Sequence, residues 1–306
     1  MRTLGVEEEF LLVTPEGRPQ PVATTVLRHA SRVAPAPTDE PGGDLEKEFK
    51  QEQIETSTPP RVELAELVAE IRPGARIAAL ATAPQAVEST VLPDRRAYAI
   101  RAEFGQTARD QLTCGCHVHV SIADEDEGVR ILDHLRPWNA VLLALSDNSP
   151  SWLGTTTGYA SYRSQVWGRW PTAGPTAPFG DAAGYRAVID DLLRTQTILD
   201  DGMVYFDARL SSRYPTVEVR VARSGLTGDL VSPLTGTPLP AADVVAQLVE
   251  HVRPALAAAG DLDWVERQVA TVLRRGNGAI QQLGWRAEGA DDDEVVRRAV
   301  DRTLAV

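Results

Sequence analysis

CGCHVHV, residues 114–120, is the stretch from which the fold can be read, because polar and β-branched side chains alternate along it. Successive side chains of a β-strand point to opposite faces of its sheet. We therefore expect a strand over residues 116–122 in which His117 and His119 share one face. A single histidine in such a strand is usually a satisfied structural residue, whereas two on one face are harder to bury without a purpose. With carboxylates nearby, they would complete a metal site with nitrogen and oxygen ligands.

Three more segments alternate in the same way and carry acidic side chains. The side chains that share a face are Glu7 and Glu9 in GVEEEF; Gln51, Gln53 and Glu55 in QEQIE; and Glu218 and Arg220 in PTVEVR. For each segment alone, a solvated edge strand or a weak surface ion pair would explain the charges. Carboxylates side by side repel one another, however, unless a cation lies between them. Mg²⁺ and Mn²⁺ prefer such oxygens and usually hold phosphates as well, so together the segments predict a metal–nucleotide enzyme built on a sheet.

A long segment rich in Gly, Pro, Thr, Trp and Tyr, residues 150–180, has no clear periodicity. Such a stretch inside a compact domain is usually functional. Its central part, GYASYRSQVWGRWP, carries two Tyr, two Trp and two Arg. Either its rings plug against the core, or Arg163 clamps a carboxylate or phosphate while the rings wall a pocket. Arg209 and Arg213 precede Glu218 closely in the sequence and favour a phosphate-handling strand there.

The composition sets the class of protein. The chain has 306 residues, of which 43% are hydrophobic and 24% charged, as in an ordinary globular protein. Its net charge of -12 argues against nucleic acid or an anionic membrane as the main partner. We see no leader peptide and no apolar run of ~18 residues, so we expect a cytoplasmic protein that does not cross a membrane. Cys114 and Cys116 are expected to be two buried thiols, because a disulfide across one residue would strain the backbone.

The expected elements do not alternate as βαβ units, which favours an α+β fold with a mainly antiparallel sheet. The expected strands are residues 3–13, 47–56, 116–122, 203–209 and 215–222, with a hairpin or loop over 229–240. The expected helices are residues 21–33, 62–71, 94–112, 126–147, 181–197, 241–258, 261–275 and 291–304. The sequence has no Walker A loop, GxGxxG or GxSxG motif, which weighs against P-loop, Rossmann and α/β-hydrolase enzymes.

Five motifs then give a family resemblance: GVEEEF, KQEQIETSTP, CGCHVHV, GYASYRSQVWGRWPT and YPTVEVRV. In this order they resemble the YbdK-like carboxylate-amine ligases, the glutamate–cysteine ligase type 2 family, over most of the chain. The resemblance implies a glutamine synthetase-like catalytic fold, with a curved, mainly antiparallel sheet, helices packed outside it and a single domain over residues 1–306. It also implies an ATP-dependent ligase. ATP would phosphorylate the γ-carboxylate of glutamate, and an amine such as cysteine would attack the acyl phosphate and release ADP and phosphate.

The resemblance also implies the site residues. The implied ligands of Mg²⁺ or Mn²⁺ are Glu7, Glu9, Glu55, His117 and Glu218. The implied catalytic residues are Arg220, which matches a phosphate-binding arginine, and Arg163, which would hold the substrate carboxylate or the transferred phosphoryl group. Lys50, Arg213 and Arg220 are the expected ATP ligands. The expected partners are small molecules (glutamate, an amine and ATP), and a homodimer is a family-based expectation.

The chain departs from the family pattern in length. Relative to the family it is shorter by several dozen residues near 221–225 and by fewer near 72–75, which puts the floor of the site in question. Two alternatives therefore stay open. One is an amino-acid or guanidino kinase on the same fold, and the other is a non-catalytic homologue that binds a small molecule.

Overall fold

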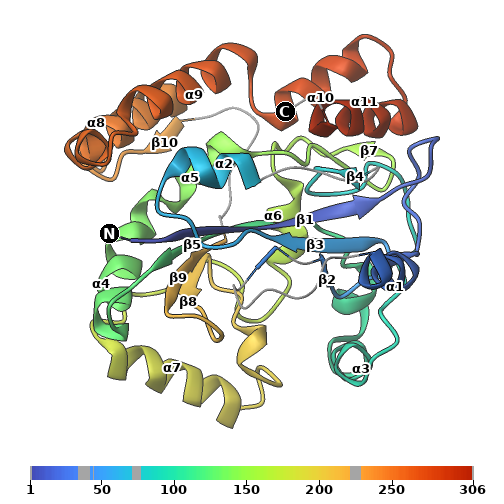
Figure 1. The fold of residues 1–306 in the computed structure, drawn as a ribbon, viewed down its shortest axis with the longest axis horizontal. Coiled ribbons are helices and arrows are strands. Elements are labelled where there is room, and N and C mark those ends of the chain that lie inside the picture. The colour runs from blue at the N-terminus through green and yellow to red at the C-terminus, as the bar shows by residue number, and fades with distance from the viewer. Residues whose placement is uncertain (1, 34–41, 44, 71–76, 221–228, 305–306) are drawn as a thin grey trace.

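A computed structural model describes residues 2–33, 42–43, 45–70, 77–220 and 229–304. The two regions of predicted shortening, residues 72–75 and 221–225, lie outside the described residues. The predicted α+β class is confirmed, because an antiparallel sheet runs through the molecule and helices lie on both sides of it (Figure 1).

A seven-stranded sheet forms the centre of the fold, in the order β2-β3-β1-β5-β9-β8, with β4 pairing the far end of β1. Its strands are β1 (Leu4–Leu12), β2 (Leu45–Lys47), β3 (Gln53–Ser57), β4 (Ile77–Ala78), β5 (Cys116–Ser121), β8 (Ala208–Leu210) and β9 (Thr216–Val219). All strand pairs of this sheet are antiparallel. Two hairpins lie outside it, β6 (Ser151–Trp152) with β7 (Thr155–Thr156), and β10 (Asp229–Val231) with β11 (Pro238–Pro240).

The register of the sheet brings the acidic and histidine residues together. Glu9 on β1 pairs with Glu55 on β3, and Glu7 pairs with His117 on β5. His119 pairs in turn with Glu218 on β9. Directly opposed side chains of antiparallel strands lie close enough to interact, so segments far apart in the sequence meet on one face.

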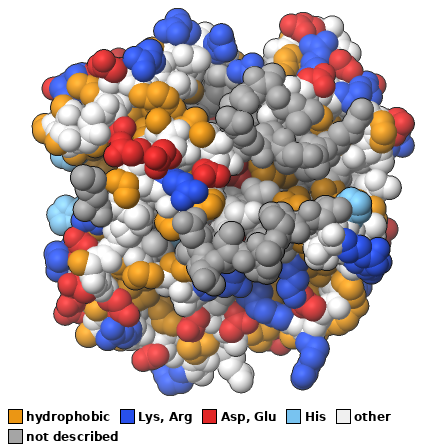
Figure 2. Space-filling model, viewed as in Figure 1, with side chains coloured by type: hydrophobic (Ala, Val, Ile, Leu, Met, Phe, Trp, Pro, Cys, Tyr) orange, Lys and Arg blue, Asp and Glu red, His pale blue; other side chains and the backbone are white. Residues whose placement is uncertain are grey.

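The helices cover the sheet from two sides in the view of Figure 1. On one side lie α3 (Arg95–Asp110), α4 (Glu125–Leu135) and α7 (Ala182–Arg194). On the other lie α8 (Ala241–Ala259), α9 (Leu262–Arg275), α10 (Gly278–Ala287) and α11 (Asp292–Leu304). The remaining helices are α1 (Ala23–Val33), α2 (Leu64–Glu70), α5 (Asn139–Ser146), α6 (Tyr162–Trp167) and the short 3₁₀ segments Arg136–Trp138 and Asp201–Met203. Figure 2 shows acidic, basic and hydrophobic side chains interspersed over the face seen in this view.

Apolar clusters fix the ends of the sheet. Val129 of α4 and Val217 of β9 belong to one buried cluster together with Tyr185 of α7. Leu11 of β1 and Val296 of α11 belong to another. Glu7 and Glu9 precede Leu11 on the same face of β1, so this strand changes from a polar lining to a core contact within three residues.

Several local predictions were wrong in detail. The strand expected over 47–56 is a hairpin, because the chain turns between β2 and β3. The helix expected over 126–147 is split into α4 and α5 by a 3₁₀ segment that contains Pro137, since proline removes a helical donor. The strand expected over 203–209 begins only at Ala208, after a 3₁₀ turn, and helix α10 was not predicted. Of the two thiols, Cys114 is buried and Cys116 is exposed on the outer face of β5.

Candidate active site

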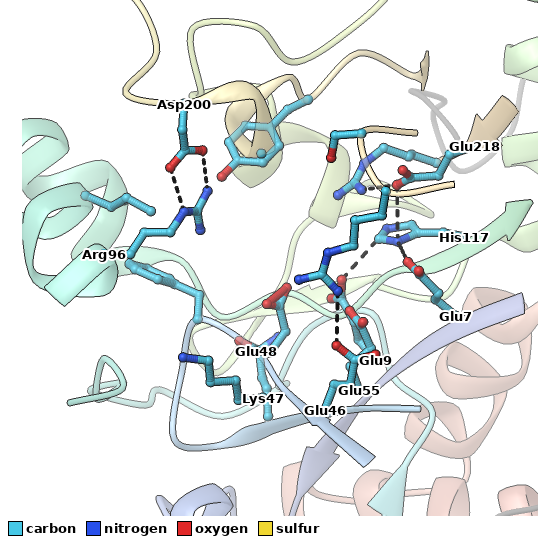
Figure 3. Close-up of a pocket in the computed structure, with 18 of the residues that line it drawn as sticks. Glu7, Glu9, Glu46, Lys47, Glu48, Glu55, Arg96, His117, Asp200 and Glu218 are labelled. Atoms are coloured by element: carbon cyan, nitrogen blue, oxygen red, sulfur yellow. Dashed lines mark hydrogen bonds and ion pairs between the residues drawn. The ribbon is translucent and has the colours of Figure 1, made fainter. Parts of the chain in front are cut away.

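A cavity of about 710 Å³ lies over the face of the sheet that carries the paired acids. Its walls come from β1, β3, β5 and β9, from the β2–β3 turn, from the start of α3 and from the segment around Trp170. Figure 3 shows the carboxylates of Glu9, Glu48 and Glu55 facing one another, with Glu7, His117 and Glu218 to one side of them. Five predicted metal ligands therefore line one cavity: Glu7, Glu9, Glu55, His117 and Glu218.

Glu7, His117 and Glu218 form the first group that could hold a divalent cation. His117 Nδ1 lies 3.3 Å from Glu7 Oε2 and 3.6 Å from Glu218 Oε1. His117 Nε2 is buried and has no hydrogen-bond partner in the described part of the chain. Burial raises the pKa of Glu7, but hydrogen bonds with His117 and His119 outweigh it and leave this pKa well below its usual range. Burial, together with the charge of Arg220, lowers the pKa of His117 and so favours the neutral ring, which is the form that binds a metal.

Glu9, Glu48 and Glu55 form the second group. Glu9 Oε2 accepts a hydrogen bond of 2.7 Å from the backbone N–H of Gly115, which fixes this carboxylate. Burial and the charges of neighbouring carboxylates raise the pKa of Glu48 to about 8 and that of Glu55 to about 10. Three carboxylates this close are stable only with a shared proton or a cation between them, so their chemistry fits Mg²⁺ or Mn²⁺.

Glu218 differs from the other acids because two arginines bind it. Arg209 donates from Nε to Glu218 Oε2 at 2.7 Å and from Nη2 to Oε1 at 3.2 Å. Arg220 donates to the same Oε1. Burial raises the pKa of Glu218, but the two arginines and His117 lower it to about 2. The Arg220 guanidinium also lies over the Trp167 ring, 5.6 Å from its centroid, and faces the cavity.

Arg163 of α6 is buried but is not among the residues that line the cavity. Its guanidinium lies 5.1 Å from the centroid of the Trp167 ring, and its Nε has no hydrogen-bond partner among the described residues. A Cβ atom at Gly115 would lie 2.7 Å from His117 Nε2 and 2.9 Å from Arg163 Nη2. Glycine at position 115 therefore allows Arg163 to approach the metal-binding wall from behind.

The two remaining predicted ATP ligands are placed differently. Lys50 is fully buried outside the cavity lining, where Nζ donates to Ser89 Oγ at 2.8 Å and to the Arg109 carbonyl oxygen at 3.1 Å. Lys50 is thus not brought to the site. Arg213 does line the cavity, at its rim, where its mostly exposed side chain pairs with Glu46 at 3.2 Å.

Several residues that line the cavity were not predicted from the sequence. Glu48 was missed because it was assigned to the same strand as Glu55, on the opposite face, and only the turn between β2 and β3 brings the two together. Arg95 and Arg96 were missed at the start of α3, although the preceding Asp94 is a recognisable N-cap whose side chain accepts from the Ala97 N–H. Arg96 donates two hydrogen bonds of 2.8 Å to the carboxylate of Asp200, which also lines the cavity.

The predicted aromatic wall is present in part. Trp167 and Trp170 line the cavity together with Phe49 and Tyr205. Tyr159 and Tyr162 lie outside the lining, and Tyr162 packs against Trp152 of β6 and against Tyr159. Gln51 also lies outside it, because its side chain oxygen accepts from Thr24 at the start of α1. None of the helices in the described part of the chain combines the length and apolar character that a bilayer crossing requires.

Known proteins resemble this chain both in fold and in sequence. Two solved structures share the fold. A bifunctional glutathione synthetase from Pasteurella multocida has a TM-score of 0.67 and 12% identity, and the match covers 99% of this chain and 52% of that one. A glutamate–cysteine ligase from Francisella tularensis in complex with AMP has a TM-score of 0.56 and 12% identity, and the match covers 100% of this chain and 89% of that one. These likenesses confirm the fold class.

Relatives in sequence are much more similar. A Streptomyces avermitilis protein named "Putative glutamate--cysteine ligase 2-1" is 42% identical over 345 residues, covering 92% of this chain and 94% of its own. A Streptomyces coelicolor protein named "Putative glutamate--cysteine ligase 2" is 41% identical over 368 residues and covers all of both chains. The pattern of Glutamate-cysteine ligase family 2 (GCS2) matches residues 3–222, which include every predicted metal ligand. The chain therefore belongs to glutamate-cysteine ligase family 2.

Proposed function

We propose that this protein is an ATP-dependent ligase that joins the γ-carboxylate of glutamate, or of a similar acid, to an amine such as cysteine. The observation that carries the proposal is the convergence of two acidic groups and of Arg220 in one cavity. Family membership supports a carboxylate-amine ligase, and the AMP complex of the Francisella tularensis neighbour fits a nucleotide-binding cavity. ATP as the substrate and ADP as the product are part of the proposal.

Two sets of residues would hold the divalent cations: Glu7, His117 and Glu218 in one, and Glu9, Glu48 and Glu55 in the other. The buried Nε2 of His117, which has no hydrogen-bond partner among the described residues and lies 3.8 Å from Glu9 Oε1, supports this fit, as do the raised pKa values of Glu48 and Glu55. Bound cations would neutralise the phosphate charge and align it with the acid. Phosphoryl transfer depends on positioning and charge stabilisation more than on covalent help.

The residues of the chain supply the rest of the site. Arg220 presents its guanidinium to the cavity, where it would stabilise charge on the transferred phosphoryl group. Arg163, from behind the wall, would offset part of the negative charge of Glu9. The acyl phosphate would hydrolyse if water reached it, and Trp167, Trp170 and Tyr205 give the cavity a wall that excludes water there.

ADP release with Mg²⁺, glutamate and a panel of amines tests the proposal. We expect turnover that requires glutamate, an amine and Mg²⁺ together, and loss of that turnover in Glu7→Gln. ADP release with a phosphorylated acid or guanidine and no amide product would indicate the kinase alternative. Binding without turnover, and no effect of Glu7→Gln, would indicate a non-catalytic homologue. The homodimer, the cytoplasmic location and the single domain stay predictions.

A further inference from the structure

The innermost wall of the cavity is made of polar side chains that are almost fully buried. Gln53, Gln111 and Thr113 line the cavity and are 2%, 4% and 2% exposed. A buried amide or hydroxyl group costs free energy unless its polar atoms find partners. The hydrogen bonds within this wall therefore indicate which atom is left for a ligand.

Gln111 uses both ends of its amide. Its Oε1 accepts from Trp170 Nε1 at 3.1 Å, and its Nε2 donates to Thr113 Oγ1. Gln53 uses only its nitrogen, which donates to the Thr113 carbonyl oxygen at 2.7 Å. No residue in the described part of the chain donates to Gln53 Oε1. Because a carbonyl partner fixes the amide nitrogen, the amide cannot be reversed, and Oε1 is the unused acceptor of this wall.

The charge around Gln53 selects the kind of donor. Gln53 precedes Glu55 by two residues on β3, and so shares its face with the Glu55–Glu9 pair. A positively charged donor is favoured beside these carboxylates over a neutral one. Of the cationic residues that line the cavity, Arg209 and Arg220 are bound to Glu218, whereas Lys47 and Arg213 lie at the open end, where their side chains are 63% and 71% exposed. Phosphates fit that end, and an ammonium group fits the end at Gln53.

We propose that Gln53 Oε1 accepts a hydrogen bond from the α-ammonium group of the acid substrate. Gln53 then selects an α-amino acid over the same dicarboxylic acid without its amino group. The identity of the acid as glutamate rests on the proposed function, whereas the ammonium site rests on the wall itself. A hydrogen bond to a charged group is lost when the amino group is removed, and we expect discrimination of about tenfold to hundredfold.

The test compares glutamate with glutarate, which has the same two carboxylates and no amino group. Titration calorimetry on the Mn²⁺-loaded protein gives both dissociation constants for wild type, Gln53→Met and Gln111→Met. Wild type is expected to bind glutamate about tenfold to hundredfold more tightly than glutarate, and Gln53→Met to bring this ratio close to one. Gln111→Met is the matched control, because both amide ends of Gln111 are already used within the wall. It should keep the ratio.

Gln53→Leu is the second variant if Gln53→Met does not fold, and Gln53→Glu, which retains an acceptor, should restore the preference for glutamate. Equal ratios in wild type and the Gln53 variants, or a wild type that binds glutamate no better than glutarate, would overturn the inference. Weaker binding of Mn²⁺ alone in Gln53→Met would also overturn it, because Gln53 would then act as a metal ligand. If no amine supports ADP release but the ratio still depends on Gln53, the ammonium site stands and the ligase proposal fails.

Discussion

Glu55→Gln should stabilise the metal-free protein at alkaline pH. In the unfolded chain Glu55 loses its proton near pH 4.5, the ordinary pKa of a glutamate, whereas in the fold burial and neighbouring carboxylates raise this pKa to about 10. Between these values the folded state binds more protons than the unfolded state, so stability falls as the pH rises. From pH 5 to pH 8 a single such group costs at most about 4 kcal/mol, at 1.36 kcal/mol per pH unit. Since Glu48 and Glu9 share the same charge repulsion, we expect about 2 kcal/mol for Glu55.

Thermal unfolding in EDTA at pH 5 and pH 8 measures this effect in wild type, Glu55→Gln and Glu88→Gln. Glu88 is an exposed glutamate outside the cavity lining, and its variant should follow wild type. At pH 5, protonated Glu55 is close in shape and charge to glutamine, so the variant should match wild type. At pH 8 it should melt about 4 °C higher.

Added Mg²⁺ should remove most of the difference at pH 8, because a cation that binds only the folded state stabilises wild type more than the variant. A melting temperature of Glu55→Gln that runs parallel to wild type over this pH range would refute the reasoning, since Glu55 would then have no raised pKa. A variant less stable than wild type at pH 8 in EDTA would refute it as well.

Three further variants test other parts of the site. Gly115→Ala should lower turnover at least tenfold and destabilise the folded protein by about 1–3 kcal/mol, because the added Cβ would clash with His117 Nε2 and Arg163 Nη2. Unchanged turnover would show that these side chains can move to make room for the methyl group. Arg220→Lys should lower kcat/KM about a hundredfold, because an ammonium group cannot replace the planar guanidinium that binds Glu218. If kcat/KM falls no further than in the control Arg194→Lys, at an exposed arginine, the role of Arg220 is structural. Lys50→Met should cost about 1–3 kcal/mol of stability, measured by urea unfolding, and leave the KM for ATP unchanged; a raised KM would return Lys50 to the nucleotide site.

Alternation along single strands could be predicted from the sequence because it depends only on the two-residue repeat of a strand. Glu7 and Glu9 share a face, as do His117 and His119, and all four line the cavity. Which strands become neighbours was not contained in any one segment, and the family resemblance implied only that the acids and His117 share one metal site. The pairings Glu9–Glu55 and His119–Glu218 follow from the register of the sheet.

The failure at Glu48 has a physical cause, which is a change of direction in the chain. The turn between β2 and β3 moves Glu48 to the face of Glu55 and sends Lys50 into the core. A two-residue repeat counted across that turn assigns Glu48 to the wrong side, whereas the expectation that Lys50 binds ATP came from the family resemblance. Hairpin turns are recognised from Gly, Asn, Asp or Pro, and the stretch from Lys47 to Gln53 has none of these. The turn is held instead by tertiary contacts, such as the Glu52 carboxylate that accepts from the Thr90 N–H.

The two groups of candidate metal ligands, Glu7–His117–Glu218 and Glu9–Glu48–Glu55, differ in how many arginines bind them. Arg209 and Arg220 bind Glu218 directly, so this carboxylate is already ionised and oriented in the absence of a cation. In the described part of the chain no arginine or lysine makes an ion pair with Glu48 or Glu55, and their raised pKa values mean that these carboxyl groups hold protons until a cation replaces them. One group is thus preorganised by the protein, whereas the other depends on what it binds. A site that must close around phosphate and cation together gains from this difference, because the second group becomes fully charged only when its ligand arrives.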